Sequence, residues 1–207
     1  MAHPTPGISY ERPESMSANQ VGTVVAKSGL THEEYGSHIL RQTLFKFTNM
    51  SITITDALAY ASQQLYDFPL GRIHVLACVA SITLTTTSAI ASTLNSGVAV
   101  AWGLGSAAAS STTLATTMMN FAPGSGESVN TLTSSTTINV ASAQDNAFLA
   151  ATNAAQIAAV VDGTSTAADL FLNLAVPTAT DIDADATVAV NGRALITWFL
   201  EGAFSLT

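Results

Sequence analysis

Residues 181–202 decide how the rest of the chain is interpreted, and their sequence is DIDADATVAVNGRALITWFLEG. The second half alternates as a β-strand does, with successive side chains on opposite faces. Both faces are largely apolar: one carries Leu195, Thr197 and Phe199, the other Ile196, Trp198 and Leu200. The pattern therefore predicts a strand that is covered on both sides, either because it is central in a sandwich or because another subunit packs on it.

Asn191-Gly192 is the strongest hairpin signal in the chain. Both central residues of a type I′ turn need a positive φ, which Asn-Gly tolerates at low cost. The sequence predicts a tight turn here, with Val190 opposite Arg193 and Val188 opposite Leu195.

Three aspartates, Asp181, Asp183 and Asp185, precede this segment and share one face of an extended chain, about 7 Å apart. Carboxylates this close repel one another unless they splay into water or hold a cation. An EF-hand loop is excluded, because Ala186 stands where its glycine belongs and Gly192 where its glutamate belongs. A solvated loop leading into a strand is favoured, and a looser Ca²⁺ site at a subunit seam is the alternative.

Period-two patterns continue over most of the chain from Arg41 onward. The clearest are TLFKFT (43–48), SITIT (51–55), RIHVLACVASITLTTT (72–87), GVAVAWGLG (97–105) and DLFLNLAVP (169–177). Enrichment in threonine and valine supports strands throughout. Many short strands separated by turn signals predict a mainly β chain with an antiparallel β-sandwich or jelly-roll-like domain.

Two segments carry helix signals. Residues 142–163 begin with Ser142 and Asp145 in a capping-box arrangement and end at Gly163, and residues 111–121 are a short helix or a loop. We therefore expect one or two short helices in a sandwich domain over residues 37–207. An extended N-terminal arm, with a short strand at 21–26, is expected over residues 1–36, because three of the six prolines fall within the first 13 residues.

Charge is scarce and unevenly distributed. The 207-residue chain has a net charge of −8 and 10% charged residues, where about 25% is usual. Residues 73–207 contain one basic residue, Arg193, and eight acidic residues, for a net charge of 1 − 8 = −7. Nucleic acid is a poor partner, since phosphates need a basic face. The long uncharged stretch from Ile73 to Gly126 is either a β surface coated with Ser and Thr or a surface buried in a subunit interface, and the second is favoured.

We expect neither a membrane partner nor export. The longest apolar run, IHVLACVASITL (73–84), contains a His and a Ser and is shorter than the ~20 residues that span a bilayer. Residues 1–15 lack the apolar core of a signal peptide. The expected place of assembly is a cytoplasm.

Catalytic and metal motifs are not evident. The segment THEEYGSH (31–38) gathers two His and two Glu without helical HExxH spacing, so a solvated loop is favoured. His74 and Cys78 would share a face of a strand about 13 Å apart, and Cys78 is expected to be a small buried hydrophobe. Without GxSxG, GxxxxGK[ST], CxxC or SxxK, we expect no enzyme, no catalytic residue and no cofactor.

The chain nevertheless resembles a known family. The resemblance rests on AKSG (26–29), HEEYG (32–36), QTLFKFTNMSITITDA (42–57), YDFPLGRI (66–73), ADLFLNLAVP (168–177) and ADATVAVNGRALITWFLEG (184–202). Over roughly residues 22–202 the chain resembles head decoration (cement) proteins and related virion proteins of tailed bacteriophages. Trp198 is followed by FLEGAF, whereas family members commonly continue with Gly-Asp-Tyr.

The resemblance implies a structural protein on the capsid exterior. Such proteins form β-rich homo-oligomers, here expected to be a trimer, that bridge and stabilise major capsid protein subunits. The N-terminal arm is then expected to grip the capsid or a neighbouring subunit. The residues expected at the interface are Pro4, Pro6, Tyr10, Arg12, Pro13 and Tyr35.

Three other functions compete with this interpretation. One is a tail or fibre component of a virion. Another is a carbohydrate-binding sandwich, which would expose aromatic side chains, whereas Trp102 and Trp198 lie in apolar strands and are expected in the core. The third is a Ca²⁺-dependent hydrolase built on the three aspartates.

Overall fold

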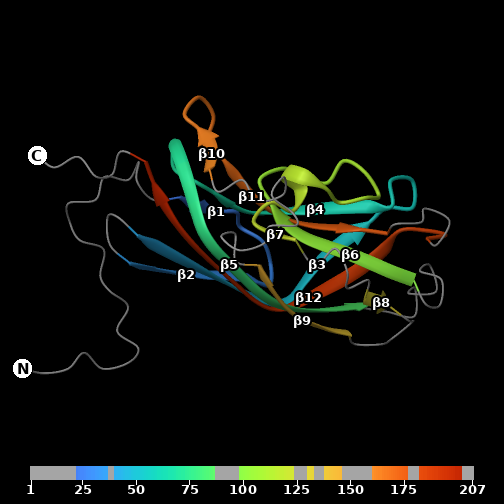
Figure 1. Ribbon diagram of the computed structural model, residues 1–207. Coiled ribbons are helices and arrows are strands. Elements are labelled where there is room, and N and C mark those ends of the chain that lie inside the picture. Colours follow the sequence, from blue (N-terminus) through green and yellow to red (C-terminus); the bar gives the residue numbers. More distant parts are fainter. Residues whose placement is uncertain are drawn as a thin grey trace, which may run out of the picture.

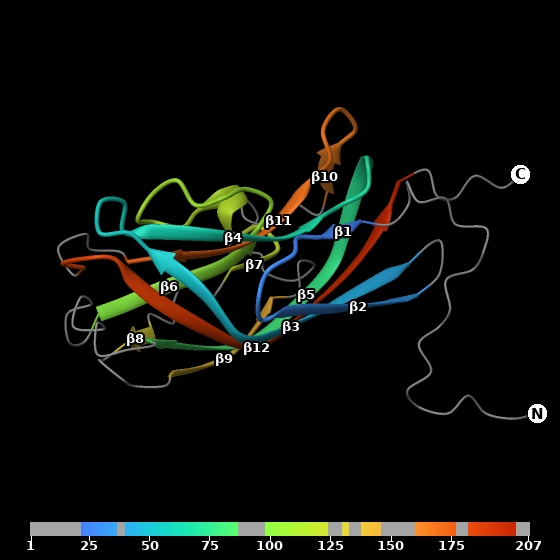
Figure 2. The ribbon, with the colours of Figure 1, turned by 180° about the vertical axis from the view of Figure 1, so that it is seen from behind.

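The computed structural model is an antiparallel β-sandwich, as the alternating patterns predict (Figure 1). It describes residues 22–36, 40–86, 98–123, 130–132, 138–145, 160–176 and 182–201. Two six-stranded sheets lie one above the other, and Figure 2 shows the same two layers from behind. No helix in these ranges is long and apolar enough to cross a bilayer.

The first sheet, called the β12 sheet, contains the opening stretch. Its order is β10 (Val160–Gly163), β5 (Gly71–Thr86), β12 (Ala186–Leu200), β3 (Arg41–Ile54) and β2 (Leu30–Gly36), and β9 (Ile138–Asp145) also pairs with β5. The second sheet, called the β11 sheet, has the order β1 (Thr23–Val24), β4 (Tyr60–Asp67), β11 (Asp169–Ala175), β6 (Val98–Gly105) and β7 (Ala122–Pro123), and β8 (Asn130–Leu132) also pairs with β6.

One apolar core fills the space between the sheets. Aromatic rings meet edge to face at one end of it: the Phe68 and Trp198 centroids are 5.2 Å apart, and the Tyr66 and Phe68 centroids 5.1 Å. Such pairs add about 0.5–1.5 kcal/mol beyond the area they bury. Trp102 and Trp198 are both buried in this core, which confirms the expectation for both tryptophans.

Strand β12 is central, pairing with β3 on one side and β5 on the other. Its inner face buries Ile196 and Trp198, and the Trp198 indole donates a 2.9 Å hydrogen bond to Thr43 Oγ1. Of the two predicted alternatives, the central position is therefore confirmed, whereas no described segment covers the outer face of β12.

The hairpin prediction is wrong, because β12 runs without a turn through Asn191 and Gly192. Gly192 pairs with Phe47 of β3 and Ile82 of β5, at a register shift against β3. Its φ is +118°, and a Cβ there would lie 2.2 Å from the Ser81 carbonyl oxygen. A glycine is therefore needed here, where the backbones of β12 and β5 approach closely. The neighbouring Asn191 Oδ1 accepts a 2.8 Å hydrogen bond from the Asn49 N–H.

The helix predictions also change. Ser142–Asp145 ends strand β9 and Val160–Gly163 forms β10, both paired with β5, so the capping-box prediction is wrong at both ends. Pairing with a sheet edge overrides the local preference there. Residues 146–159 lie outside the described residues. Within 111–121 the helical element is a single 3₁₀ turn, η3 (Thr116–Met118).

The sandwich also begins earlier than expected. Strands β1 and β2 lie inside the range assigned to the arm, and β2 pairs with β3 over its whole length. The short strand expected at 21–26 corresponds to β1. Residues 1–21 lie outside the described residues.

Replacing Gly192 with alanine should be strongly destabilising, because the side chain would meet the β5 backbone at a positive φ. We expect Gly192→Ala to lower the free energy of unfolding by about 3 kcal/mol in urea denaturation. The adjacent exposed residue provides the control, since Arg193→Ala should change it by less than about 0.5 kcal/mol. A cost below about 1 kcal/mol for Gly192→Ala would contradict the continuous strand.

Candidate functional site

The outer face of the β11 sheet is covered by the chain's own segment 106–121. Leu114 and Met119 of this segment are buried against Ala175 in a small second core. The segment approaches closely because β6 presents Gly103 and Gly105: a Cβ at Gly105 would lie 2.3 Å from the Thr117 carbonyl oxygen. This apolar face therefore has an internal cover.

A buried amide holds that cover in place. The Asn173 side chain is fully buried. Its Oδ1 accepts hydrogen bonds from Ser62 Oγ (2.6 Å) and the Ala109 N–H (2.9 Å), and its Nδ2 donates to the Ala107 (2.9 Å) and Met118 (2.6 Å) carbonyls. A buried amide with all its partners fixes the segment in one position.

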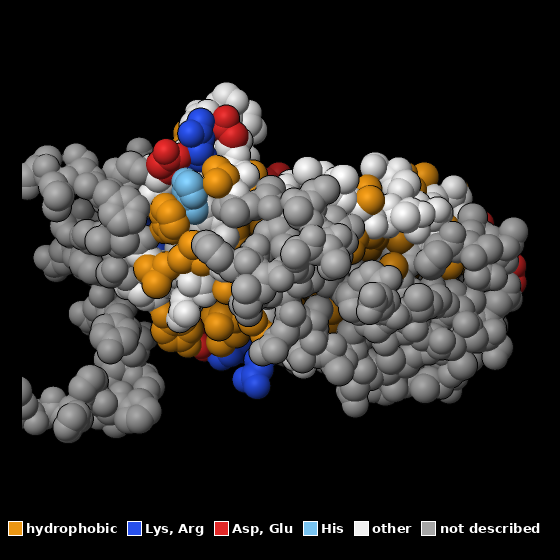
Figure 3. Space-filling model, viewed as in Figure 1, with side chains coloured by type: hydrophobic (Ala, Val, Ile, Leu, Met, Phe, Trp, Pro, Cys, Tyr) orange, Lys and Arg blue, Asp and Glu red, His pale blue; other side chains and the backbone are white. Residues whose placement is uncertain are grey.

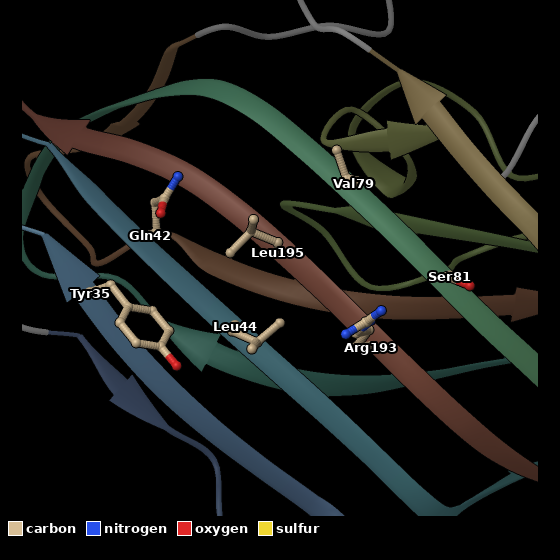
Figure 4. A pocket seen from close by; sticks show the side chains of 7 residues that line it. All are labelled: Tyr35, Gln42, Leu44, Val79, Ser81, Arg193 and Leu195. Atoms are coloured by element: carbon tan, nitrogen blue, oxygen red, sulfur yellow. The ribbon is translucent and has the colours of Figure 1, made fainter. Parts of the chain in front are cut away.

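The outer face of the β12 sheet differs, since no described segment covers it. A hollow of about 620 Å³ lies across four of its strands (Figure 4). Its lining residues are Tyr35 from β2, Gln42 and Leu44 from β3, Val79 and Ser81 from β5, and Arg193 and Leu195 from β12. Tyr35 and Val79, on the two outermost of these four strands, are 37% and 40% exposed. Figure 3 shows hydrophobic side chains gathered over β5 and β12.

Among the described charged side chains around the hollow, two form an ion pair with each other and one has no partner. At its β2 margin, Glu33 accepts hydrogen bonds from Lys46 Nζ and the Tyr35 hydroxyl, and these bonds lower the pKa of Glu33. Arg193 is exposed, and among the described residues it has no hydrogen-bonded or ion-pair partner. The hollow thus combines an apolar floor with one unpaired guanidinium.

The apolar face continues toward β10. The His74 and Phe199 rings stack with centroids 4.5 Å apart and planes 5° from parallel. Glu201 lies beside them, its Oε2 3.3 Å from His74 Nε2 and 3.4 Å from Arg72 Nη1. Val160 is 41% exposed on β10, opposite His74.

The segment 31–38 is not the solvated loop that its composition favours, because residues 31–36 belong to strand β2. The strand separates its acidic residues: Glu33 binds Lys46, whereas Glu34 accepts a hydrogen bond from the buried Tyr66 hydroxyl. His38 lies outside the described residues. Within the described ranges, no three His, Cys, Asp or Glu side chains are placed to hold a metal ion.

The aspartates near β12 have a structural contact. Asp183 and Asp185 are exposed, and Asp185 Oδ1 accepts a 3.1 Å hydrogen bond from the Asp56 N–H in the turn after β3. Asp181, the third member of the Ca²⁺ candidate, lies outside the described residues.

His74 and Cys78 lie on opposite faces of β5. The register shift between Thr197 and Trp198 leaves one additional residue in β5, so the expectation that the two share a face is wrong. Cys78 is buried in the core, as expected, and burial raises the pKa of its thiol to about 12. A neutral buried thiol is neither a nucleophile nor a metal ligand.

Of the residues expected at an interface, only Tyr35 falls in the described residues, and it lines the hollow. Pro4, Pro6, Tyr10, Arg12 and Pro13 lie outside them. The sequence did not predict that the other six lining residues come together in one site. The one available signal was that Leu195 belongs to a strand that is apolar on both faces.

Comparisons with protein-family models, with curated proteins and with solved structures found no match to this chain.

The two faces of β12 should respond differently to a polar side chain. We expect Leu195→Asn, in the hollow, to lower the free energy of unfolding by less than about 1 kcal/mol. Ile196→Asn, one residue along and facing the core, should cost about 3–5 kcal/mol. Urea denaturation of both variants measures the difference, and equal costs would mean that Leu195 is a core residue.

The buried thiol predicts a pH dependence. Because the folded state keeps the Cys78 proton, its contribution to stability is full below pH ~9 and is lost as the pH rises toward the folded pKa of about 12. A thiol reagent at about pH 8 should label Cys78 only after unfolding. As the pH rises from 9.0 toward about 12, wild type should lose more stability than Cys78→Ala. Rapid labelling of the folded protein would show that the Cys78 thiol is not buried.

Proposed function

We propose that this chain is a structural virion protein that decorates an icosahedral phage capsid and stabilises it by bridging major capsid protein subunits. The observation that carries the proposal is the outer face of the β12 sheet, where Tyr35, Leu44, Val79 and Leu195 form an apolar floor that no described segment covers. On the opposite outer face, by contrast, the chain's own segment 106–121 covers the apolar surface of the β11 sheet.

The composition of this face fits a protein interface. Interfaces combine a desolvated apolar and aromatic centre with a polar margin. Here the floor is apolar, and Gln42, Ser81 and Arg193 are the polar lining residues. The lining contains no His, Asp or Glu, the usual general acids and bases, so binding suits the hollow better than catalysis.

The body of the protein suits a component that resists mechanical force. Strand β12 spans Ala186–Leu200 and is paired along both sides, and the core rings interlock edge to face. A face carried on long central strands deforms little when a partner binds. Repetition on a lattice then multiplies modest contacts through effective concentration. The virion assignment itself rests on the resemblance of the strand sequences to head decoration proteins.

The number of copies in purified source particles tests the proposal. We expect many copies in a simple integer ratio to the major shell protein, measured by quantitative mass spectrometry. A handful of copies would indicate a tail or portal component, and complete absence would refute a virion role.

Rebinding of variants to particles stripped of this protein tests whether the outer face of the β12 sheet makes the contact. Leu195→Asp should reduce occupancy at least tenfold, because a charge would be buried at the contact. Ser165→Asp, in the exposed bend after β10, is the matched control and should bind as wild type does. Equal binding of both variants would exclude this face.

A further inference from the structure

The outer face of the β12 sheet is complementary to itself. The outward residues along β12 are, in order, Arg193, Leu195, Thr197, Phe199 and, just beyond the strand, Glu201. Thr197 thus lies midway between two apolar side chains and, farther out, between two opposite charges. A second copy turned end for end would present the same order in reverse, apolar against apolar and cation against anion.

The neighbouring strands extend the middle of this pattern across the sheet. Thr197 pairs with Gln42 of β3 and with Ala77 of β5. Gln42 in turn pairs with Tyr35 of β2, and its Nε2 donates a 3.4 Å hydrogen bond to Thr197 Oγ1. This row crosses four strands and divides the face into two halves.

The two halves have complementary shapes. On the Arg193 side lies the hollow of about 620 Å³, with Leu195 in its floor (Figure 4). On the Glu201 side, outside the lining of the hollow, the rings of His74 and Phe199 stack 4.5 Å apart. Turning a second copy about the middle row places its stacked rings over this hollow.

The same rotation brings Arg193 to Glu201 of the second copy, at both ends of the contact. Arg193 has no hydrogen-bonded or ion-pair partner among the described residues. Glu201 contacts His74 and Arg72 through Oε2, so Oε1 can accept from a further donor. A two-fold axis along β12 would instead place Arg193 against its own copy, and the repulsion of like charges selects the first orientation.

The face is large enough for a weak dimer. From Arg193 to Glu201 the chain advances about 27 Å, and four strands cover about 19 Å across the sheet. Two such faces would bury roughly 1,000 Å² in total, the lower limit for a specific interface.

We propose that a second copy of this chain covers this face in a two-fold dimer. The two β12 strands cross in opposite directions at Thr197, Phe199 of each copy fills the hollow of the other, and Arg193 pairs with Glu201. A closed two-fold contact gives a dimer, whereas the resemblance implies a trimer. The inference goes beyond the proposed function: the dimer is the form without particles, and the capsid replaces the second copy on the same face.

Sedimentation equilibrium of the full-length protein without particles tests the proposal. We expect a monomer–dimer equilibrium, which Leu195→Asp should weaken at least tenfold because a charge would be buried. Arg193→Glu and Glu201→Arg should each weaken it about two- to tenfold, because like charges then meet. An equimolar mixture of these two variants should associate more tightly than either alone, since both contacts of the mixed dimer again join opposite charges. Cooperative unfolding of each variant checks that it folds.

A cysteine in the middle row gives a second measurement. Thr197→Cys should form dimers linked between like positions by a short bis-maleimide, while the buried Cys78 stays unreactive. The control is Thr187→Cys, which is exposed but lies about 33 Å from position 197 along β12; it should give little linked dimer.

A protein that stays monomeric, or that forms trimers, overturns the proposal. A dimer that Leu195→Asp leaves intact also overturns it, because such a dimer uses another surface. None of these results changes the copy number in particles, so the two proposals can fail separately.

Discussion

The structure depends on unbroken backbone pairing along β12. This strand pairs with β3 on one side and with β5 on the other along most of its length. Pairing on both sides leaves room for no side chain at Gly192, where the β5 backbone comes closest. One glycine in a positive-φ conformation thus allows the chain to pass straight through a sequence that would otherwise turn.

The two faces of β12 differ in their surroundings, because one packs in the core and the other lines the hollow. The inner face of β12 supplies Trp198, around which the core aromatics pack. The outer face supplies Leu195 and Arg193 to the hollow. Since one backbone carries both sets, the core beneath the hollow holds in place the strands that form it. This preorganisation limits the entropy that binding would cost.

Alternation predicted the sandwich and the burial of both tryptophans, because both follow from a period of two. A strand that is apolar on both faces left two alternatives for β12, a central position or a cover from another subunit, and the structure shows the central position. The turn at Asn191-Gly192 was mispredicted because local turn chemistry carries no information about Ser81 across the sheet. The β5 bulge similarly reversed the expected relation of His74 to Cys78. The hollow combines four strands that are distant in sequence, so its membership depends on register, which alternation does not determine.

The scarcity of charged residues affects how selectively the outer face of the β12 sheet can bind a partner. A sheet face without charge would associate with any apolar surface, and edge strands add to that hazard. The β2 edge carries Glu33 paired with Lys46, which keeps water at that margin. Inside the margin, Arg193 tolerates an acidic partner and repels a basic one, so a single cation makes an otherwise unselective face discriminate. In a chain of net charge −8, a partner for this face has to carry a carboxylate that Arg193 can pair with, and selectivity between partners depends on the difference in their free energies of binding.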